Sequence, residues 1–302
     1  MVNIGTRISE LKLRNPTILA SGILGETSGS MKRVASYGAG AIVTKSIGMK
    51  PREGYPNPTA VEIECGILNS MGLPNPGIEE FKKEIDEIDE IDIPVIGSIF
   101  GKDEKEFAFL AKKMEEYGLD AIELNLSCPH ARGYGLEIGS SPDVVREVVR
   151  EVKREISIPV FPKLSANAGD IVEIGKAAEE GGADGVVAIN SLRAMKIDIH
   201  LKKPILYNKV GGYSGKGIKP VAVRCVYELS RELDIPVIGV GGVETWEDAV
   251  EYILAGACAV QIGSAVYYRG LSVFAEICEG MKRWMEENGF ESIEDFRGVA
   301  LK

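Results

Sequence analysis

One short apolar motif occurs four times along this chain, each time just after a glycine. Each copy has the pattern of a helix end, a glycine stop and a strand of a few apolar residues. The copies are residues 37–45 (YGAGAIVTK), 117–125 (YGLDAIELN), 181–190 (GGADGVVAIN) and 255–264 (AGACAVQIGS). This recurrence predicts a fold built from repeated strand-and-helix units.

A second motif, entered through proline, alternates with the first. Its three copies are residues 93–100 (IPVIGSIF), 158–165 (IPVFPKLS) and 235–242 (IPVIGVGG), and each has the pattern of a short buried strand. Residues 16–21 (PTILAS) add one more, so four, three and one strands make eight. Near-continuous apolar strands of this kind indicate a parallel sheet that is buried on both faces.

The intervals between these strands carry apolar residues at three- and four-residue spacing, which is typical of amphipathic helices. The expected helices cover residues 103–117, 142–155, 169–180, 220–233 and 245–254. Eight strand-then-helix units favour a closed (β/α)8 TIM barrel over a doubly wound open sheet, and alternating motifs suit a barrel interior filled in layers. A length of 302 residues suits one such barrel, so we expect a single domain over residues 1–302.

Three connections at the carboxyl ends of the expected strands are long. They follow the second, fourth and sixth strands and cover residues 46–77, 125–139 and 191–219. Long loops in a compact domain are usually functional, and barrel enzymes place their sites at this end, so we expect the site here. Residues 1–14 are expected to form a short hairpin that closes the opposite end of the barrel.

Charge and cysteine usage exclude several classes of function. The chain has 35 basic and 45 acidic residues, a net charge of -10, which makes nucleic acid and anionic membranes poor partners. It has five widely spaced cysteines, no C-x-x-C and two histidines, so we expect no metal site in it and a reducing, cytoplasmic location. The lack of a signal-like segment or a long apolar run supports the same expectation.

Polar residues stand at the expected carboxyl ends of the strands. An interior lysine is rarely fully buried unless it is paired. Two lysines that converge on one cavity of an acidic protein therefore suggest a bound anion or an electron-rich ring. The strand ends are Ser21, Lys45 with Ser46, Ser98, Asn125, Lys163, Asn190, Gly241 with Gly242, and Gly263 with Ser264.

Glycines gather at the last two strand ends and in residues 211–217 (GGYSGKG). Loops after the seventh and eighth strands of such barrels commonly bind phosphate through backbone N–H groups, and close approach of the backbone leaves no room for a side chain. The three clusters predict a phosphate site, for a substrate or for a cofactor such as FMN.

One cysteine differs from the other four. Cys128 follows the fourth strand in a polar, glycine-flanked loop, where Lys45 and Lys163 would favour its thiolate, so it is a candidate base or nucleophile. A free cysteine is usually an inert core residue. We expect this of Cys65, Cys225, Cys258 and Cys278.

Five of these stretches, taken together, are specific enough to indicate a resemblance to a known protein family. They are residues 69–73 (NSMGL), 125–129 (NLSCP), 162–165 (PKLS), 211–215 (GGYSG) and 239–242 (GVGG). With them the chain resembles the dihydroorotate dehydrogenase family over essentially its whole length. It is most similar to the class 1B catalytic subunit, which that family pairs with an electron-transfer subunit.

The resemblance implies one FMN per chain over the barrel mouth. FMN would be held by Ser21, Lys45, Ser46, Ser98, Asn125, Lys163, Ile189, Gly215, Gly241, Gly242, Gly263 and Ser264. Dihydroorotate or orotate would be held by Lys45, Asn69, Ser70, Met71, Gly72, Leu73, Asn125, Asn190 and Ser191. The loop that carries Cys128 would act as a lid.

The implied reaction is the oxidation of (S)-dihydroorotate to orotate in de novo pyrimidine (UMP) biosynthesis. Cys128 would remove the C5 proton, hydride would pass from C6 to flavin N5, and Lys163 would stabilise negative charge near N1. FAD and a 2Fe–2S cluster on the partner subunit would pass electrons to NAD, in a heterotetramer built on a homodimer core.

The chain departs from the family pattern at three positions, which leaves alternatives open. His130 stands where Asn is usual, Ala166 replaces a common Pro, and Ser98 stands where Asn is frequent. Cys-Pro-His is also similar to the flavin domain of dihydropyrimidine dehydrogenase, so a uracil reductase is an alternative. Others are a non-redox phosphate-binding lyase or isomerase, a non-catalytic scaffold, and a class 1A homodimer that uses fumarate.

Overall fold

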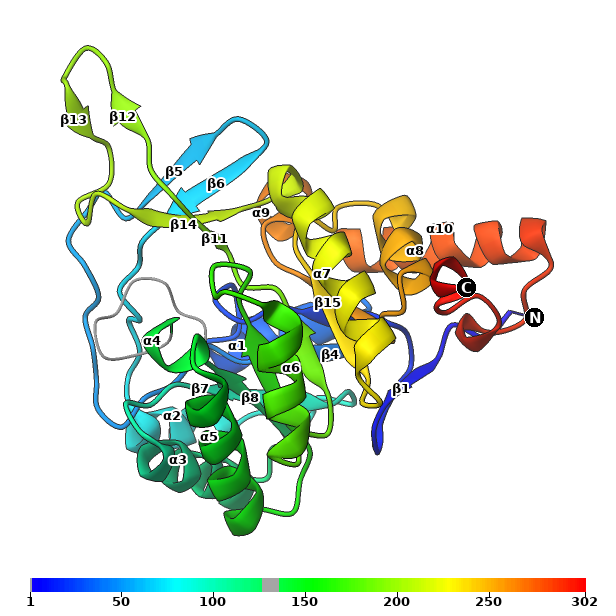
Figure 1. The fold of residues 1–302 in the computed structure, drawn as a ribbon, viewed down its shortest axis with the longest axis horizontal. Coiled ribbons are helices and arrows are strands. Elements are labelled where there is room, and N and C mark those ends of the chain that lie inside the picture. The colour runs from blue at the N-terminus through cyan, green and yellow to red at the C-terminus, as the bar shows by residue number, and fades with distance from the viewer. Residues whose placement is uncertain (1, 127–135) are drawn as a thin grey trace.

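Eight parallel strands close into a barrel in a computed structural model that describes residues 2–126 and 136–302 (Figure 1). Around the barrel the strands follow the order β10-β15-β16-β3-β4-β7-β8-β9. Their bounds are β3 (Thr17–Leu19), β4 (Ala41–Val43), β7 (Val95–Ile99), β8 (Ala121–Asn125), β9 (Val160–Leu164), β10 (Val186–Ala188), β15 (Val237–Val240) and β16 (Ala259–Ile262). Each strand falls within one of the eight predicted segments, so the (β/α)8 barrel is confirmed.

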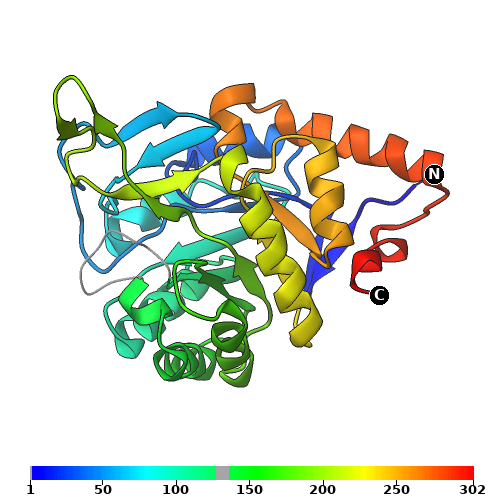
Figure 2. The same ribbon diagram turned by 45° about the horizontal axis from the view of Figure 1, so that its top comes forward.

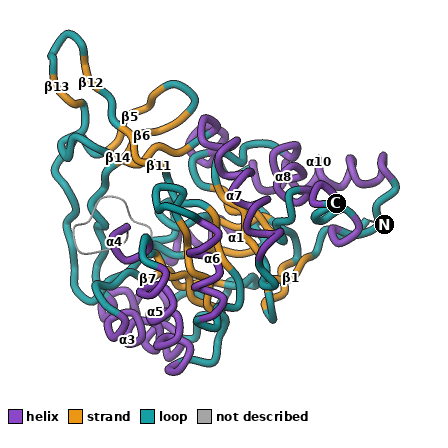
Figure 3. The backbone as a smooth tube through the Cα atoms, in the orientation of Figure 1, coloured by secondary structure: helices purple, strands orange, loops and turns teal. Residues whose placement is uncertain are grey.

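Helices surround these strands (Figure 3). The longer ones are α1 (Ser28–Ser36), α2 (Ile78–Ile85), α3 (Glu104–Glu116), α5 (Pro142–Glu155), α6 (Ile171–Glu180), α7 (Lys219–Glu232), α8 (Trp246–Leu254) and α10 (Val273–Asn288). Shorter turns are α4 (Leu136–Gly139), α9 (Ala265–Arg269), η1 (Lys216–Ile218), η2 (Ile293–Asp295) and η3 (Val299–Leu301). Among the helices described, none has both the length and the apolar character to span a bilayer.

The barrel interior is apolar at its amino-terminal end. Ile18, Ile96, Phe161 and Ile238 come from different strands and pack in one buried cluster. The first residues form the predicted hairpin, β1 (Thr6–Ile8) paired antiparallel with β2 (Leu11–Leu13). The hairpin's apolar residues, among them Ile8, belong to the same cluster, so the hairpin closes this end of the barrel.

Two of the long loops combine into one sheet at the opposite end. The loop after β4 supplies β5 (Ala60–Ile63) and β6 (Gly66–Asn69), and the loop after β10 supplies β11 (Leu192–Ala194) and β14 (Gly211–Ser214). These strands form an antiparallel sheet in the order β11-β14-β6-β5, which we call the cap sheet. The small hairpin of β12 (Ile197–Asp198) and β13 (Lys203–Pro204) projects beyond it (Figures 1 and 2).

Candidate active site

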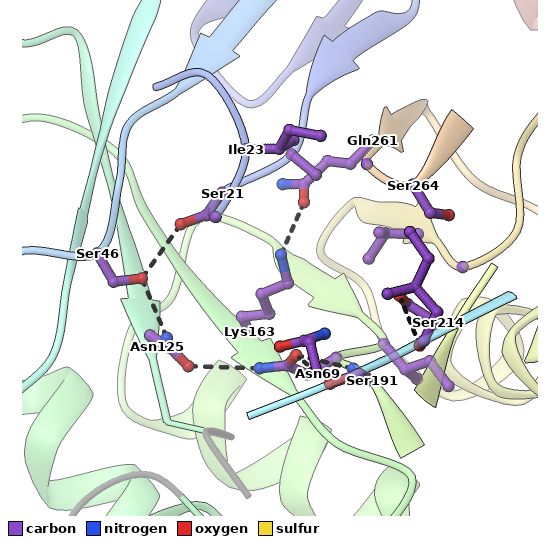
Figure 4. Close-up of a pocket in the computed structure, with 18 of the residues that line it drawn as sticks. Ser21, Ile23, Ser46, Asn69, Asn125, Lys163, Ser191, Ser214, Gln261 and Ser264 are labelled. Carbon is purple, nitrogen blue, oxygen red and sulfur yellow. Dashed lines mark hydrogen bonds between the residues drawn. The ribbon is translucent and has the colours of Figure 1, made fainter. Parts of the chain in front are cut away.

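A cavity of about 350 Å³ opens between the carboxyl ends of the barrel strands and the cap sheet (Figure 4). From the predicted cofactor set it is lined by Ser21, Lys45, Ser46, Asn125, Lys163, Ile189, Gly215, Gly241, Gly242, Gly263 and Ser264. From the predicted substrate set it is lined by Asn69, Met71, Gly72, Leu73, Asn190 and Ser191. Residues from strand ends far apart in the sequence therefore meet at one place.

Two predicted residues, Ser70 and Ser98, do not line the cavity, and a third, Cys128, lies outside the described residues. Ser70 is buried just after β6, and its Oγ has no hydrogen-bond partner among the described residues. Ser98 is fully buried and contacts a lining residue, with its Oγ 2.9 Å from Ser46 Oγ. The part of the predicted lid that carries Cys128, residues 127–135, lies outside the described residues.

One corner of the cavity is a cradle of backbone donors. Within the described part of the chain, the N–H groups of Gly242, Gly263 and Ser264 donate to no protein acceptor. Gly242 has φ +69°, and a Cβ on it would lie 2.7 Å from the carbonyl oxygen of Gly215. A Cβ on Gly263 would meet only Ala20 Cβ, at 3.6 Å, so this glycine faces open space. Unpaired N–H groups beside open space fit the phosphate of a nucleotide-like cofactor.

A row of hydrogen bonds forms the polar wall of the cavity (Figure 4). Ser21 Oγ lies 3.1 Å from Ser46 Oγ, and Asn125 Nδ2 donates to Ser46 Oγ at 3.0 Å. Asn190 Nδ2 donates in turn to Asn125 Oδ1 at 3.5 Å. Amide side chains carry both donors and acceptors, so this wall can bind a ring that has both carbonyl and N–H groups.

The charge of Lys163 has a partner inside the protein. The sequence suggested a bound anion or an electron-rich ring as its partner, but Lys163 Nζ lies 3.5 Å from Glu123 Oε1 and donates to Gln261 Oε1 at 2.9 Å. Glu123 and Gln261 also line the cavity and were not predicted. A sequence signal was available, because each lies two residues before a predicted site residue, Asn125 or Gly263, and residues two apart in a strand share a face.

Mostly apolar residues complete the lining, and they were also missed. They come mainly from the loop after β3, from the cap sheet and from the turns around β15. The remaining lining residues are Ala20, Gly22, Ile23, Ile67, Pro74, Ser214, Ile218, Val240 and Val243. Apolar surface around a few fixed polar groups is typical of sites for small molecules and cofactors.

The other cysteines divide between the core and the surface. Cys225, Cys258 and Cys278 are buried as predicted, but Cys65 is exposed, so its assignment to the core was wrong. Cys65 has φ +56° and lies between β5 and β6, where the short turn keeps its side chain out of any core. No group of three or more metal-binding side chains gathers in residues 2–126 or 136–302.

Comparison with known proteins agrees with this arrangement. The family model described as dihydroorotate dehydrogenase matches residues 3–285. The chain is 55% identical over 305 residues to the protein named dihydroorotate dehydrogenase B (NAD(+)), catalytic subunit, of Pyrococcus furiosus, with 100% of both chains covered. Proteins of that name from Methanocaldococcus jannaschii (52% identical; 98% of this chain and 97% of the relative) and Thermoplasma acidophilum (52%; 100% of both) also match. The chain belongs to the dihydroorotate dehydrogenase family.

Proposed function

We propose that this chain binds FMN in the cavity and oxidises (S)-dihydroorotate to orotate. The observation that carries the proposal is the combination, in one cavity, of a backbone N–H cradle, three asparagines and two lysines. The relatives' name, dihydroorotate dehydrogenase B (NAD(+)), catalytic subunit, supports the same reaction.

In this proposal the cradle at Gly242, Gly263 and Ser264 holds the FMN phosphate, with Gly215 and Gly241 beside it. FMN, when bound, supplies the acceptor for the hydride from C6. Lys163 places a cation at the cavity floor, where it stabilises negative charge on the ring.

The substrate is held on the side of the cavity formed by the cap sheet and the Asn125–Asn190 row. Asn69 Nδ2 donates to the Gly212 carbonyl at 3.4 Å, which ties the substrate side of the cavity to β14. Asn125 and Asn190 orient the carbonyl and N–H groups of the ring. Cys128 removes the proton from C5, a role that only a nearby base can fill.

The electrons leave through a second protein. We infer from the words "catalytic subunit" in the relatives' name that the chain works with an electron-transfer subunit. That subunit carries FAD and a 2Fe–2S cluster and passes electrons to NAD, in a heterotetramer with a homodimer of this chain at its centre.

An anaerobic titration tests the proposal. Purified protein reconstituted with FMN should turn yellow, and dihydroorotate, but not dihydrouracil, should bleach it. Cys128→Ser should bind FMN normally but bleach at least 100-fold more slowly. Adding the partner subunit and NAD should restore the yellow colour.

Gly263→Ala tests the cradle separately. Its methyl group enters open space, so the melting temperature should stay the same while the dissociation constant for FMN rises at least tenfold. Gly29→Ala is the matched control, because this glycine lies on helix α1 with nothing within 4 Å of an added Cβ. Protein that stays colourless with FMN, or a Gly263→Ala protein that binds FMN like the control, would contradict the proposal.

A further inference from the structure

A carboxylate, an amide and an ammonium group meet at the floor of the cavity. Glu123 lies on β8, Lys163 on the neighbouring β9, and Gln261 on β16, which is on the opposite side of the closed barrel. Glu123 and Gln261 are each 1% exposed and Lys163 is 6% exposed. The three side chains therefore interact across the barrel interior with almost no contact with solvent.

The three groups form a closed ring of contacts. Gln261 Nε2 donates to Glu123 Oε2 at 2.7 Å, and Lys163 Nζ donates to Gln261 Oε1 at 2.9 Å. Lys163 Nζ and Glu123 Oε1 are 3.5 Å apart. Figure 4 shows the Lys163 side chain pointing at Gln261. The charges fix the orientation of the amide, because the reversed amide would place its NH₂ against the ammonium group and its oxygen against the carboxylate.

Stability alone does not account for this group. Burying an ion pair costs desolvation free energy, and replacing such a pair by apolar residues is often neutral or stabilising. The neighbouring layer of the same barrel is apolar, with Ala121 and Phe161 two residues before Glu123 and Lys163 on the same strands. The carboxylate of Glu123 lies in the layer that borders the cavity. This position indicates that it acts on the molecule bound in the cavity.

We propose that Glu123 is a positioning residue that holds Lys163 Nζ at the cavity floor and lowers the reduction potential of the bound flavin. This inference rests on the proposed function, since it needs FMN in the cavity. A neutral flavin ring that takes up a hydride gains two electrons and one proton, and so one negative charge. Lys163 stabilises that charge, and the carboxylate of Glu123 offsets part of the stabilisation. Gln261 joins the two and keeps their distance fixed.

The experiment is an anaerobic reductive titration of the FMN-loaded protein against a reference dye. Glu123→Gln keeps the size of the side chain and its ability to accept a hydrogen bond, and it removes the negative charge. At a fixed potential the ratio of reduced to oxidised flavin should rise at least tenfold, which is a positive midpoint shift of about 30 mV for a two-electron couple.

Two further variants separate charge from packing. Glu123→Asp keeps the charge but withdraws it from Lys163, so its midpoint should shift in the same direction by less. Because the buried lysine still has a negative charge nearby, Glu123→Asp serves if Glu123→Gln does not fold. Phe161→Leu is the matched control, because it disturbs the packing of the same barrel interior without changing a charge, and its midpoint should equal that of the wild type.

The possible results distinguish a failure of this inference from a failure of the proposed function. An unchanged or more negative midpoint in FMN-loaded Glu123→Gln or Glu123→Asp would overturn the role of Glu123 and leave the proposed function standing. A wild-type protein that binds no FMN would overturn both. A midpoint shift in Phe161→Leu as large as that in Glu123→Gln would assign the effect to packing and overturn the role of the charge.

Discussion

The four cysteines among the described residues differ in burial, and therefore in the reactivity of their thiols. Burial raises the pKa of the Cys225 and Cys278 thiols to about 11 and that of Cys258 to about 12. Cys258 Sγ also donates to the carbonyl oxygen of Val237 at 3.3 Å. Because the thiolate is the reactive form, these three thiols are unreactive near neutral pH, whereas Cys65 is exposed to reagents.

This difference predicts the labelling pattern of the native protein. In a Cys128→Ser background at about pH 8, iodoacetamide should add one group within minutes, and intact-mass analysis should detect it. The double variant Cys128→Ser/Cys65→Ser should add none until denaturant exposes the core. Rapid labelling of that double variant in its native state would mean that the buried thiols are accessible.

Some residues of the site could be predicted from the sequence, and one interaction within it could not. Lys45, Asn125 and Lys163 were predictable because each is a polar residue at or near the carboxyl end of an apolar strand, and strand ends of a barrel converge. The partnership of Glu123 with Gln261 was not, because it joins strands on opposite sides of the closed barrel that are 138 residues apart. Strand order and shear decide such contacts, and no local pattern records them.

At the level of elements, one ion-pair cluster joins the first turns of α7 and α8 beside the glycine cradle. Lys219 Nζ lies 2.6 Å from Asp248 Oδ1 and 2.7 Å from Glu251 Oε2. The other oxygen of Asp248 accepts the N–H groups of Glu244 and Thr245, each at 2.9 Å, and completes a capping box with Thr245. Burial alone would raise the pKa of Asp248, but the hydrogen bonds from Lys219, Glu244 and Thr245 outweigh it and hold the pKa below its usual value.

Asp248→Asn should therefore lower the free energy of unfolding by about 1–3 kcal/mol at pH 6. Since the folded pKa lies below the unfolded value of about 3.9, the contribution is complete above that value and is lost as the pH falls through the folded pKa. Urea unfolding at pH 6 and pH 3 measures this, and the difference between variant and wild type should shrink at pH 3. Glu251→Gln, at the exposed end of the cluster, should cost less than about 1 kcal/mol. An equal cost of Asp248→Asn at both pH values would exclude the carboxylate as its source.

Helices with a clear amphipathic pattern could be predicted from the sequence. Short strands that form only when two distant loops pair could not. Helix α5 begins at Pro142 after Ser141 and ends at Glu155, the predicted bounds, because Val145, Val148, Val149 and Val152 mark its buried face. The cap sheet was predicted only as loops. Its strands have three or four residues and contain Gly66, Gly211 and Gly212, and β6 pairs with β14 from 143 residues further along the chain. At Gly66 an added Cβ would collide with the carbonyl oxygen of Ser214, a constraint visible only once the two loops meet.

In the whole molecule, one end of the barrel carries the binding cavity and the other end is closed by packing that stabilises the fold. The carboxyl ends of the strands, under the cap sheet, carry the cavity. The amino-terminal end is closed by the β1–β2 hairpin, whose Thr6 Oγ1 donates to the Cys258 carbonyl at 2.8 Å. In Figure 1 the cap sheet and the N-terminus lie at opposite ends of the molecule. Stability and binding should therefore respond to changes at different ends.

Ile8 tests this separation, because it is fully buried in the interior cluster and lies on the hairpin, away from the cavity. Ile8→Ala should lower the free energy of unfolding by about 2–5 kcal/mol, through lost burial and the space left behind. Lys12→Ala on the exposed face of the same hairpin should change it by less than about 0.5 kcal/mol. Urea unfolding gives both values, and fluorescence titration at temperatures where each variant is folded should give wild-type FMN affinity. Ile8→Ala protein with wild-type stability would show that the hairpin does not support the barrel. A loss of FMN affinity in folded Ile8→Ala protein would show instead that the two ends are coupled through the layered interior.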